Sequence, residues 1–290
     1  MAERLSEVEA RRASIEELGA VTDAMRSLAA VRLQQASAML AGTRTYAEVV
    51  AGALAQAVAL RHGAPGRWPA RNGRGRPALV LFAPEHGFVG AFAERLADAA
   101  LAAPPGHALW VVGSRGAALL EERGRPADWW LPMATHTDGV TATARRVAEA
   151  LYRAAAEDRL SRVELLYGRS ASGGAPDIVR EALLPLDLAR FPAAGGAVPP
   201  LTNLPVADLV AHLVDEYVFA LLVRAAMESF AAENAARLLV MMAARQNIET
   251  TLDELTGTVR RLRQEQITTE LIELATGAEA AGGGPRRPPA

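Results

Sequence analysis

The sequence predicts an α/β protein: a long antiparallel coiled coil of N- and C-terminal helices, with a Rossmann-like α/β domain inserted between them. Residues 3–60 contain no proline, and residues 206–276 contain no proline and a single glycine, Gly257. Each of these stretches is typical of one long α-helix, because proline breaks a helix interior. Between them, short apolar runs alternate with helical patterns, which is typical of parallel βαβ units with helices on both faces of a sheet.

The N-terminal segment, residues 1–62, is predicted to be the first coiled-coil helix. Two neighbouring rows at seven-residue spacing contain mostly small or flexible side chains, which permit close approach by another helix. The first row is Val8, Ile15, Thr22, Ala29, Ala36 and Thr43, and the second is Leu18, Met25, Arg32, Met39 and Tyr46.

A loop at residues 63–77, rich in proline, glycine and arginine, is predicted to link this helix to an inserted domain at residues 78–191. The elements expected in the domain are strands at 78–83, 108–112, 129–133, 162–167 and 178–186 and helices at 89–102, 114–123 and 139–158. The loop contains a basic cluster beside Trp68, made of Arg67, Arg71, Arg74 and Arg76. We interpret this cluster as a solvated surface, with an acidic partner or nucleic acid as the alternative.

After a linker at 192–205, residues 206–277 are predicted to form the second coiled-coil helix. Its apolar residues recur at 3,4 spacing, with only Arg245 out of step, as in a coiled coil. They are Leu238, Met241, Ile248, Leu252, Leu255, Val259 and Leu262. At 1.5 Å per residue the helix is about 105 Å long, so it needs a partner, for which the N-terminal helix is the candidate. Residues 278–290 are predicted to be a disordered tail.

The composition excludes several classes of protein. The chain has 290 residues, a net charge of −2 and no cysteine, and all of its 31 basic residues are arginine. Thiol chemistry, lysine chemistry and a phosphate loop of the GxxxxGK[ST] type are therefore excluded. The charge balance argues against nucleic acid as a partner. No apolar run is long enough for a membrane span, and the charged N-terminus does not look like a signal peptide, so we expect a cytoplasmic protein.

Two glycine-containing turns are the candidate ligand sites of the inserted domain. The turn at 86–90 (HGFVG) follows a strand and precedes a helix, where a pyrophosphate would bind, but its spacing is not GxGxxG. The turn at 113–116 offers Ser114 as an N-cap. The five histidines are scattered and no serine lies in a GxSxG elbow, so we expect no metal, no cofactor and no catalytic residue.

Both ends of the chain carry motifs that resemble the gamma subunit of F-type ATP synthases. Residues 267–278 (ITTELIELATGA) are similar to that family's closing motif, ITxExxE followed by GA. Residues 262–266 (LRQEQ) resemble its ARQ segment, and residues 233–242 resemble its SEHAARMxAM stretch. Residues 22–30 (TDAMRSLAA) are similar to TKAMKMVAA. The matches occur in the expected order along the whole chain.

The resemblance implies a non-catalytic rotor. In that family the terminal helices form the central stalk inside a ring of three alpha and three beta subunits, and the α/β domain lies against the epsilon subunit and the c-ring, at the cytoplasmic face of the membrane. Rotation couples ion flow to ATP synthesis or hydrolysis on the ring. The residues implied to contact the ring are Met25, Arg263, Gln264, Thr268 and Glu270.

Some residues depart from the family pattern. Asp23 and Arg26 stand where the family often has lysine, and the reversed charge at Asp23 suggests altered coupling beside an acidic beta-subunit surface. The turn HGFVGAF is a loose match, and the chain continues about ten residues past the usual end, beyond Ala280. Two alternatives stay open at this point: a nucleotide-binding α/β protein with helical extensions, which requires a phosphate contact at 87–90, and a coiled-coil scaffold that self-associates.

Overall fold

The computed structural model describes residues 2–60, 67–68, 75–171, 174–191 and 201–282. The chain divides into two compact units, each described by itself: residues 1–26 with 241–290, and residues 27–240. Both contain parts of the two long helices α1 (Ala2–Ala59) and α5 (Val206–Gly282).

The first unit is an antiparallel pair of helical segments. Glu9 of α1 pairs with Arg263 of α5, whereas Asp23, later in α1, pairs with Arg245, earlier in α5. The contacting residue numbers therefore rise in one helix and fall in the other. The seam predicted from the 3,4 spacing is confirmed, because the α5 residues buried in this unit all belong to it: Met241, Ile248, Val259 and Leu262.

The second unit is built on a five-stranded sheet in the order β4-β3-β2-β5-β6. β2 lies parallel to both β3 and β5, β3 lies parallel to β4, and β6 runs antiparallel to β5 at the edge. The strands are β2 (Arg76–Phe82), β3 (Ala108–Val112), β4 (Trp129–Leu131), β5 (Leu160–Arg169) and β6 (Asp177–Leu184).

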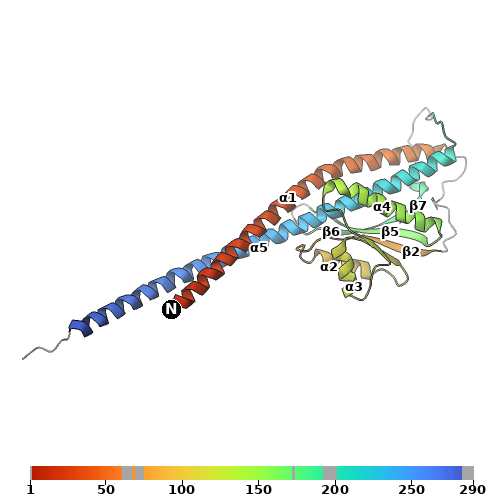
Figure 1. Ribbon diagram of the computed structural model, residues 1–290. Helices are drawn as coiled ribbons and strands as arrows, with labels where there is room; N and C mark the ends of the chain where they lie inside the picture. Colours follow the sequence, from red (N-terminus) through yellow and green to blue (C-terminus); the bar gives the residue numbers. More distant parts are fainter. Residues whose placement is uncertain (1, 61–66, 69–74, 172–173, 192–200, 283–290) are drawn as a thin grey trace, which may run out of the picture. The chain divides into compact units, whose positions relative to one another are not determined.

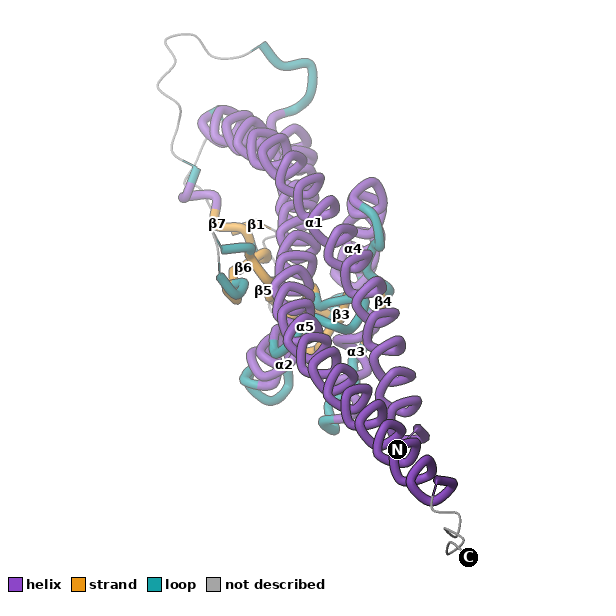
Figure 2. The backbone as a smooth tube through the Cα atoms, turned by 90° about the vertical axis from the view of Figure 1, so that its left-hand side faces the viewer, coloured by secondary structure: helices purple, strands orange, loops and turns teal. Residues whose placement is uncertain are grey.

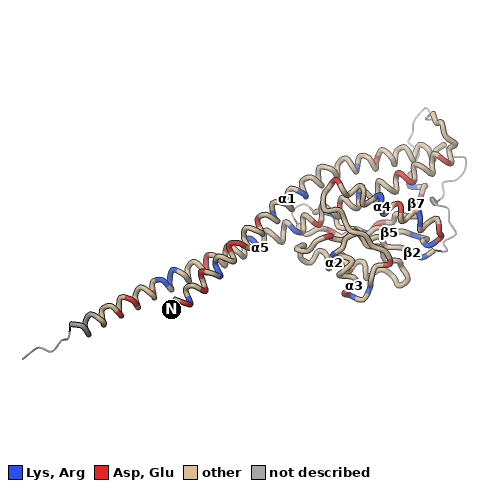
Figure 3. The backbone as a smooth tube through the Cα atoms, in the orientation of Figure 1, with Lys and Arg blue, Asp and Glu red and all other residues tan. Residues whose placement is uncertain are grey.

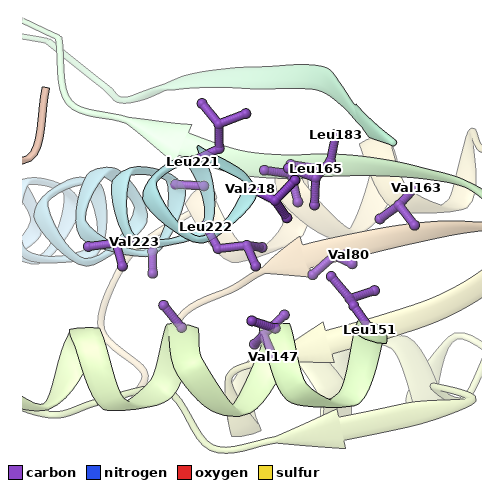
Figure 4. Close-up of a cluster of buried hydrophobic side chains, with 14 of the residues drawn as sticks. Val80, Val147, Leu151, Val163, Leu165, Leu183, Val218, Leu221, Leu222 and Val223 are labelled. Atoms are coloured by element: carbon purple, nitrogen blue, oxygen red, sulfur yellow. The ribbon is translucent and has the colours of Figure 1, made fainter. Parts of the chain in front are cut away.

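Helices cover both faces of this sheet, as predicted. α2 (Phe92–Leu101) and α3 (Ser114–Glu122) lie on one face, and α4 (Thr137–Ala156) and α5 lie on the other (Figure 1). Successive side chains of β2 point to opposite faces of the sheet. Leu79 packs in the cluster with α2 and α3, and Val80 packs in the cluster with α4 and α5. Figure 4 shows the second cluster, in which Val147 of α4 and Leu222 of α5 point toward the sheet residues.

The middle of α5 is a core helix rather than one side of an isolated coiled coil. Nearly every residue from 218 to 237 is buried, including the charged residues Glu228, Glu233 and Arg237. In this unit α1 runs beside α5 (Figure 2). The two helices are joined by a salt bridge of 2.7 Å from Arg44 Nη2 to Glu228 Oε1, and the Glu228 side chain is only 4% exposed.

Two predicted segments need correction. α5 continues to Gly282, five residues past the predicted end at 277 and into the predicted tail, because the alanines and the glutamate after Gly277 are strong helix formers. Residues 283–290 lie outside the described part. The predicted linker at 63–77 contains a two-residue strand, β1 (Arg67–Trp68), which pairs antiparallel with β7 (Leu186–Asp187). That pairing is non-local, so local composition did not predict it. The cluster residues Arg71 and Arg74 fall outside the described residues.

Two smaller elements differ as well. β4 ends at Leu131 rather than at residue 133. A short 3-10 helix, η1 (Leu188–Arg190), follows β7, and the Asp187 side chain caps it by accepting the Ala189 N–H at 3.1 Å. None of the described helices is long and apolar enough to cross a membrane.

Candidate partner-contact surface and the closed crevice

The five residues expected to contact a partner ring all lie in the first unit. Met25 is half-buried on α1, and the four residues of α5 are exposed. Those four are Arg263, Gln264, Thr268 and Glu270. The structure therefore presents these side chains to solvent and leaves them reachable by another protein.

Local hydrogen bonds determine which donor and acceptor groups of these side chains remain available to a partner protein. Arg263 Nη2 donates to Glu9 Oε1 at 2.5 Å, so this guanidinium is held by its own chain although its side chain is 62% exposed. Thr268 Oγ1 donates to the backbone carbonyl of Gln264 at 2.8 Å, four residues back, so its hydroxyl proton is used within the helix. Glu270 accepts from Gln266 Nε2 at 2.9 Å. The Gln264 carboxamide has no hydrogen bond among the described residues.

The two charges that broke the sequence patterns compensate each other. Arg245, out of step in the apolar seam of α5, places Nη1 3.5 Å from Asp23 Oδ2 on α1 and donates from Nε to Glu249 at 2.9 Å. Asp23 also lies 3.5 Å from Arg26. A cation at a seam position is tolerated because an acid on the facing helix neutralises it. The reversed charge at Asp23 is therefore balanced within the chain, which the sequence alone did not reveal.

The crevice where a Rossmann-like domain would bind a phosphate lies in the second unit, at the carboxyl ends of its parallel strands. There Glu85, which follows β2, fills the N-terminus of α3. Its carboxylate accepts the Ser114 N–H at 2.9 Å and the Ser114 hydroxyl at 2.7 Å. It also accepts the Met133 N–H at 2.8 Å, just after β4. An internal carboxylate thus occupies the position of an anionic ligand.

The N-cap prediction for Ser114 is wrong. The N-cap is Gly113, whose φ of 125° favours glycine, and Ser114 is the first residue of α3. The Ser114 hydroxyl donates to Glu85 instead of accepting a backbone N–H of its own helix. Local capping rules could not predict this arrangement, because the accepting carboxylate lies 29 residues away in the sequence.

α5 closes the other side of the same crevice. Glu233 accepts the backbone N–H groups of Glu85 and His86 at 3.0 and 3.4 Å. Arg237 donates to the carbonyls of His86 and Gly87 at 3.3 and 3.1 Å and pairs with Glu233 at 2.6 Å. Both charged side chains are less than one-tenth exposed. The start of the turn is thus fixed to α5 through backbone groups of residues 85–87.

These contacts occupy the backbone N–H groups of Glu85 and His86 and the carbonyls of His86 and Gly87, so a phosphate cannot bind to those N–H groups. In the nucleotide-binding alternative the turn after β2 would face a phosphate, and here it faces a buried Glu–Arg pair of the same chain. No group of histidine and carboxylate side chains in the described ranges is arranged to hold a metal ion.

Comparison with known proteins agrees with this geometry. A family profile described as ATP synthase matches residues 4–281. The ATP synthase gamma chain of Parafrankia is 29% identical over 305 residues, covering 98% of this chain and all of the relative. The ATP synthase gamma chain of Solibacter usitatus is also 29% identical, over 96% of this chain and 99% of its own length. This chain belongs to the ATP synthase gamma family.

Solved structures show the same fold at low sequence identity. A chain in the Euglena gracilis mitochondrial ATP synthase, OSCP/F1/c-ring in rotational state 3, has a TM-score of 0.67 at 14% identity and covers 100% of this chain and 99% of its own length. A chain in the rotor of the same enzyme, in rotational state 1, has a TM-score of 0.64 at 13% identity, with 92% and 100% covered.

The structure explains why the gamma-family stretch at 233–237 contains polar residues. From the sequence alone, these residues (ENAAR) could only be matched to the family motif. In the structure Glu233 and Arg237 fix the turn after β2, and Asn234 Nδ2 donates to the Phe230 carbonyl at 2.8 Å within the core. The sequence signal for these contacts was a Glu and an Arg four residues apart in a largely apolar helix. That spacing alone is also common on solvated helices, so it did not single out the two residues.

Proposed function

We propose that this gamma-family chain is the central-stalk rotor subunit of an F-type ATP synthase. It couples ion flow through the membrane c-ring to ATP synthesis or hydrolysis at the alpha and beta catalytic sites, and it contributes no catalytic residue itself. The observation that carries the proposal is the antiparallel helix pair of the first unit, whose exposed polar residues leave a surface free for a surrounding ring while its apolar seam is closed internally.

The contact residues have distinct proposed roles. Met25 supplies a flexible thioether for a contact that is made and released as the stalk turns. Arg263 and Gln264 offer guanidinium and carboxamide groups, which suit carboxylate or backbone partners on a beta subunit. Thr268 offers its acceptor lone pairs and Glu270 a carboxylate on the next turn of the helix.

The proposed partners are the alpha and beta subunits, the epsilon subunit and the c-ring, with no nucleic acid. The proposed location is the cytoplasmic face of the inner (plasma) membrane, where the chain is held peripherally as part of the complex. The closed crevice of the α/β domain supports a structural role for this domain in place of ligand binding at the crevice.

Reconstitution tests the proposal. The full chain is mixed with its alpha and beta subunits, and ATP hydrolysis and rotation of the chain are measured. We expect one copy to join each ring and Arg263→Ala with Gln264→Ala to reduce hydrolysis and torque. Arg260→Ala, an exposed arginine on the same helix, is the matched control, and Glu9→Gln separates the loss of the internal pair with Arg263 from the loss of a partner contact. A chain that never joins an alpha–beta ring contradicts the proposal.

A further inference from the structure

A cavity of about 560 Å³ lies in the second unit at the amino ends of the parallel strands, at the edge of the sheet opposite to Glu85. Its wall includes the first residues of β2, β3, β4 and β5 and the last turn of α4. A volume of this size is typical of sites for small molecules. The crevice closed by Glu85, Glu233 and Arg237 is at the other edge, so its contacts leave this cavity open.

Two tryptophans form the aromatic part of the wall. The ring centroids of Trp110 and Trp129 are 4.8 Å apart, and the two rings are tilted by 35°. Trp110 is only 4% exposed, yet its indole N–H donates to none of the residues that the structure describes, and the same is true of half-buried Trp129. Buried indole N–H groups usually find an acceptor. These two donors are therefore left for a ligand in the cavity.

Charged side chains form the rest of the polar wall. Basic positions, blue in Figure 3, lie near the start of β2. Arg76, Arg153 and Arg159 line the cavity together with Asp128 and Asp158, which leaves one net positive charge. Both carboxylate oxygens of Asp128 are engaged, one by Arg76 at 3.2 Å and the other by a backbone N–H of β3 at 2.8 Å. Asp158 is not free either.

Arg153 is the cation of this wall that has no internal partner. It is exposed in the last turn of α4 and forms no ion pair within the described ranges. Arg159 uses its Nε on Glu157 at 2.6 Å, and its two terminal nitrogens donate to no described group. The side-chain groups that the wall leaves free are thus all donors, and a guanidinium donor matches a carboxylate or a phosphate in geometry and in charge.

We propose that this cavity binds a small aromatic anion, a molecule with a flat ring and a carboxylate or phosphate group. The two tryptophans suit the ring, because aromatic rings pack well in offset or edge-to-face arrangements. Arg153 and the indole N–H groups suit the anionic group. A purely apolar ligand would leave these donors without acceptors, and an anion without a ring would leave the tryptophan wall uncovered. The inference does not depend on the proposed rotor function, since all of the lining residues belong to this chain.

Titration of the full-length chain tests whether the site exists. The probes are AMP, an aromatic phosphate, and 2-naphthoate, an aromatic carboxylate, and NMR follows the indole N–H resonances. We expect the resonances of Trp110 and Trp129 to shift with at least one probe and that of the exposed Trp130 to stay unchanged. A shift with AMP alone assigns a phosphate, and a shift with 2-naphthoate alone assigns a carboxylate. If neither probe shifts Trp110 or Trp129 at millimolar concentration, the inference is overturned.

Two further probes separate the parts of the ligand. Adenosine has the ring of AMP without the anion, and inorganic phosphate is an anion without a ring. We expect both to bind more weakly than the aromatic anion that shifts the tryptophan resonances. An equally strong response to adenosine or to inorganic phosphate would contradict the proposed ligand class.

Two matched pairs of variants locate the site. Arg153→Gln removes the unpaired cation, whereas Arg146→Gln makes the same change at an exposed position of α4 outside the cavity. Trp129→Leu removes part of the aromatic wall, whereas Trp130→Leu changes the exposed neighbour. We expect Arg153→Gln and Trp129→Leu each to raise the Kd of the bound probe by about tenfold, as for one charge-assisted hydrogen bond or one ring contact. Both controls should stay within about twofold of the wild type.

The arginine pair keeps the inference testable if Trp129→Leu does not fold, because Arg153 and Arg146 are both exposed and form no ion pair among the described residues. Circular dichroism of each variant checks the fold. Equal Kd values for Arg153→Gln and Arg146→Gln overturn the inference.

Discussion

Single charged residues in this chain are explained by partners far away in the sequence. Asp23 is a reversed charge when read against the family, and Arg245 interrupts an apolar seam, yet each lies within ion-pair distance of the other. Glu233 and Arg237 are charged residues in a buried part of α5. Their burial is explained by hydrogen bonds to the backbone of the turn at 85–87. In both cases the compensation lies in the fold and not in neighbouring residues.

The Asp23–Arg245 pair predicts a small coupling energy. Both side chains are about one-third exposed, so solvent screens the interaction, and a double-mutant cycle with Asp23→Asn and Arg245→Gln is expected to give about 0.2–1 kcal/mol. Urea unfolding of the wild type, the two single variants and the double variant measures it. A coupling of several kcal/mol is incompatible with a solvent-screened pair.

The Glu233–Arg237 pair predicts a large cost when it is broken from one side. Arg237→Met leaves the Glu233 carboxylate buried without its cation, and we expect the free energy of unfolding to fall by about 3–5 kcal/mol. Adding Glu233→Gln removes the stranded charge and should restore part of the loss. Denaturant unfolding of the single and double variants tests this, and a double variant less stable than Arg237→Met would be the opposite result.

At the scale of elements, α5 is one continuous helix in two different environments. Around residues 218–237 it is buried on nearly all sides by the sheet and its neighbouring helices, whereas beyond Met241 it buries one seam against α1. The space around two glycines shows the difference between loosely and tightly packed parts of the chain. A Cβ at Gly257 of α5 meets nothing within 4 Å, whereas a Cβ at Gly168 of β5 would overlap the Phe92 ring and lie 2.9 Å from Ala232 Cβ.

The same substitution is therefore expected to have opposite effects at these two glycines. Gly257→Ala should stabilise the chain by about 0.5–1 kcal/mol, because it removes backbone entropy from the unfolded state. Gly168→Ala should destabilise it by about 1–3 kcal/mol through overpacking against α2 and α5. Thermal unfolding midpoints decide the matter, and shifts of the same sign would show that the close packing of β5 against α5 is absent in solution.

For the whole molecule, tyrosine burial predicts alkaline lability. Burial is the largest cause that raises the pKa of Tyr152, Tyr167 and Tyr217 above the usual 10.0, and nearby Asp215 or Glu181 raises each further. These phenols stay protonated in the folded chain at a pH where the unfolded chain has released its protons. The folded state then binds more protons than the unfolded state, so stability is lost as pH rises through the unfolded value.

The measurement is the free energy of unfolding as a function of pH. We expect it to fall from about pH 9 to about pH 11, with phenolate absorbance near 295 nm rising together with unfolding. Tyr152→Phe should make the slope shallower, whereas His136→Gln, at an exposed position, should leave it unchanged. If the slope is the same in Tyr152→Phe and in the wild type, Tyr152 does not contribute to the loss of stability at alkaline pH.

Much of the architecture was predictable because it is written in local periodicity. Proline-free stretches and the 3,4 seam predicted both long helices, and alternating apolar runs predicted the sheet with helices on both faces. The β1–β7 pair was not predictable, since Trp68 pairs with Leu186 across more than a hundred residues. The end of α5 was missed because Gly277 resembles a stop, although the alanines after it sustain the helix.

The contact residues Met25, Arg263, Gln264, Thr268 and Glu270 came from motif resemblance, and their partner contacts stay predictions because they require other chains. By itself, the sequence determined the fold class, the absence of thiol and lysine chemistry, and the family, since composition, periodicity and motifs are properties of the chain order. Only the tertiary structure decided that Glu85, Glu233 and Arg237 bind backbone groups at the carboxyl ends of the strands and that Asp23 pairs with Arg245. Those outcomes depend on which distant groups meet in space, and no local pattern specifies such meetings.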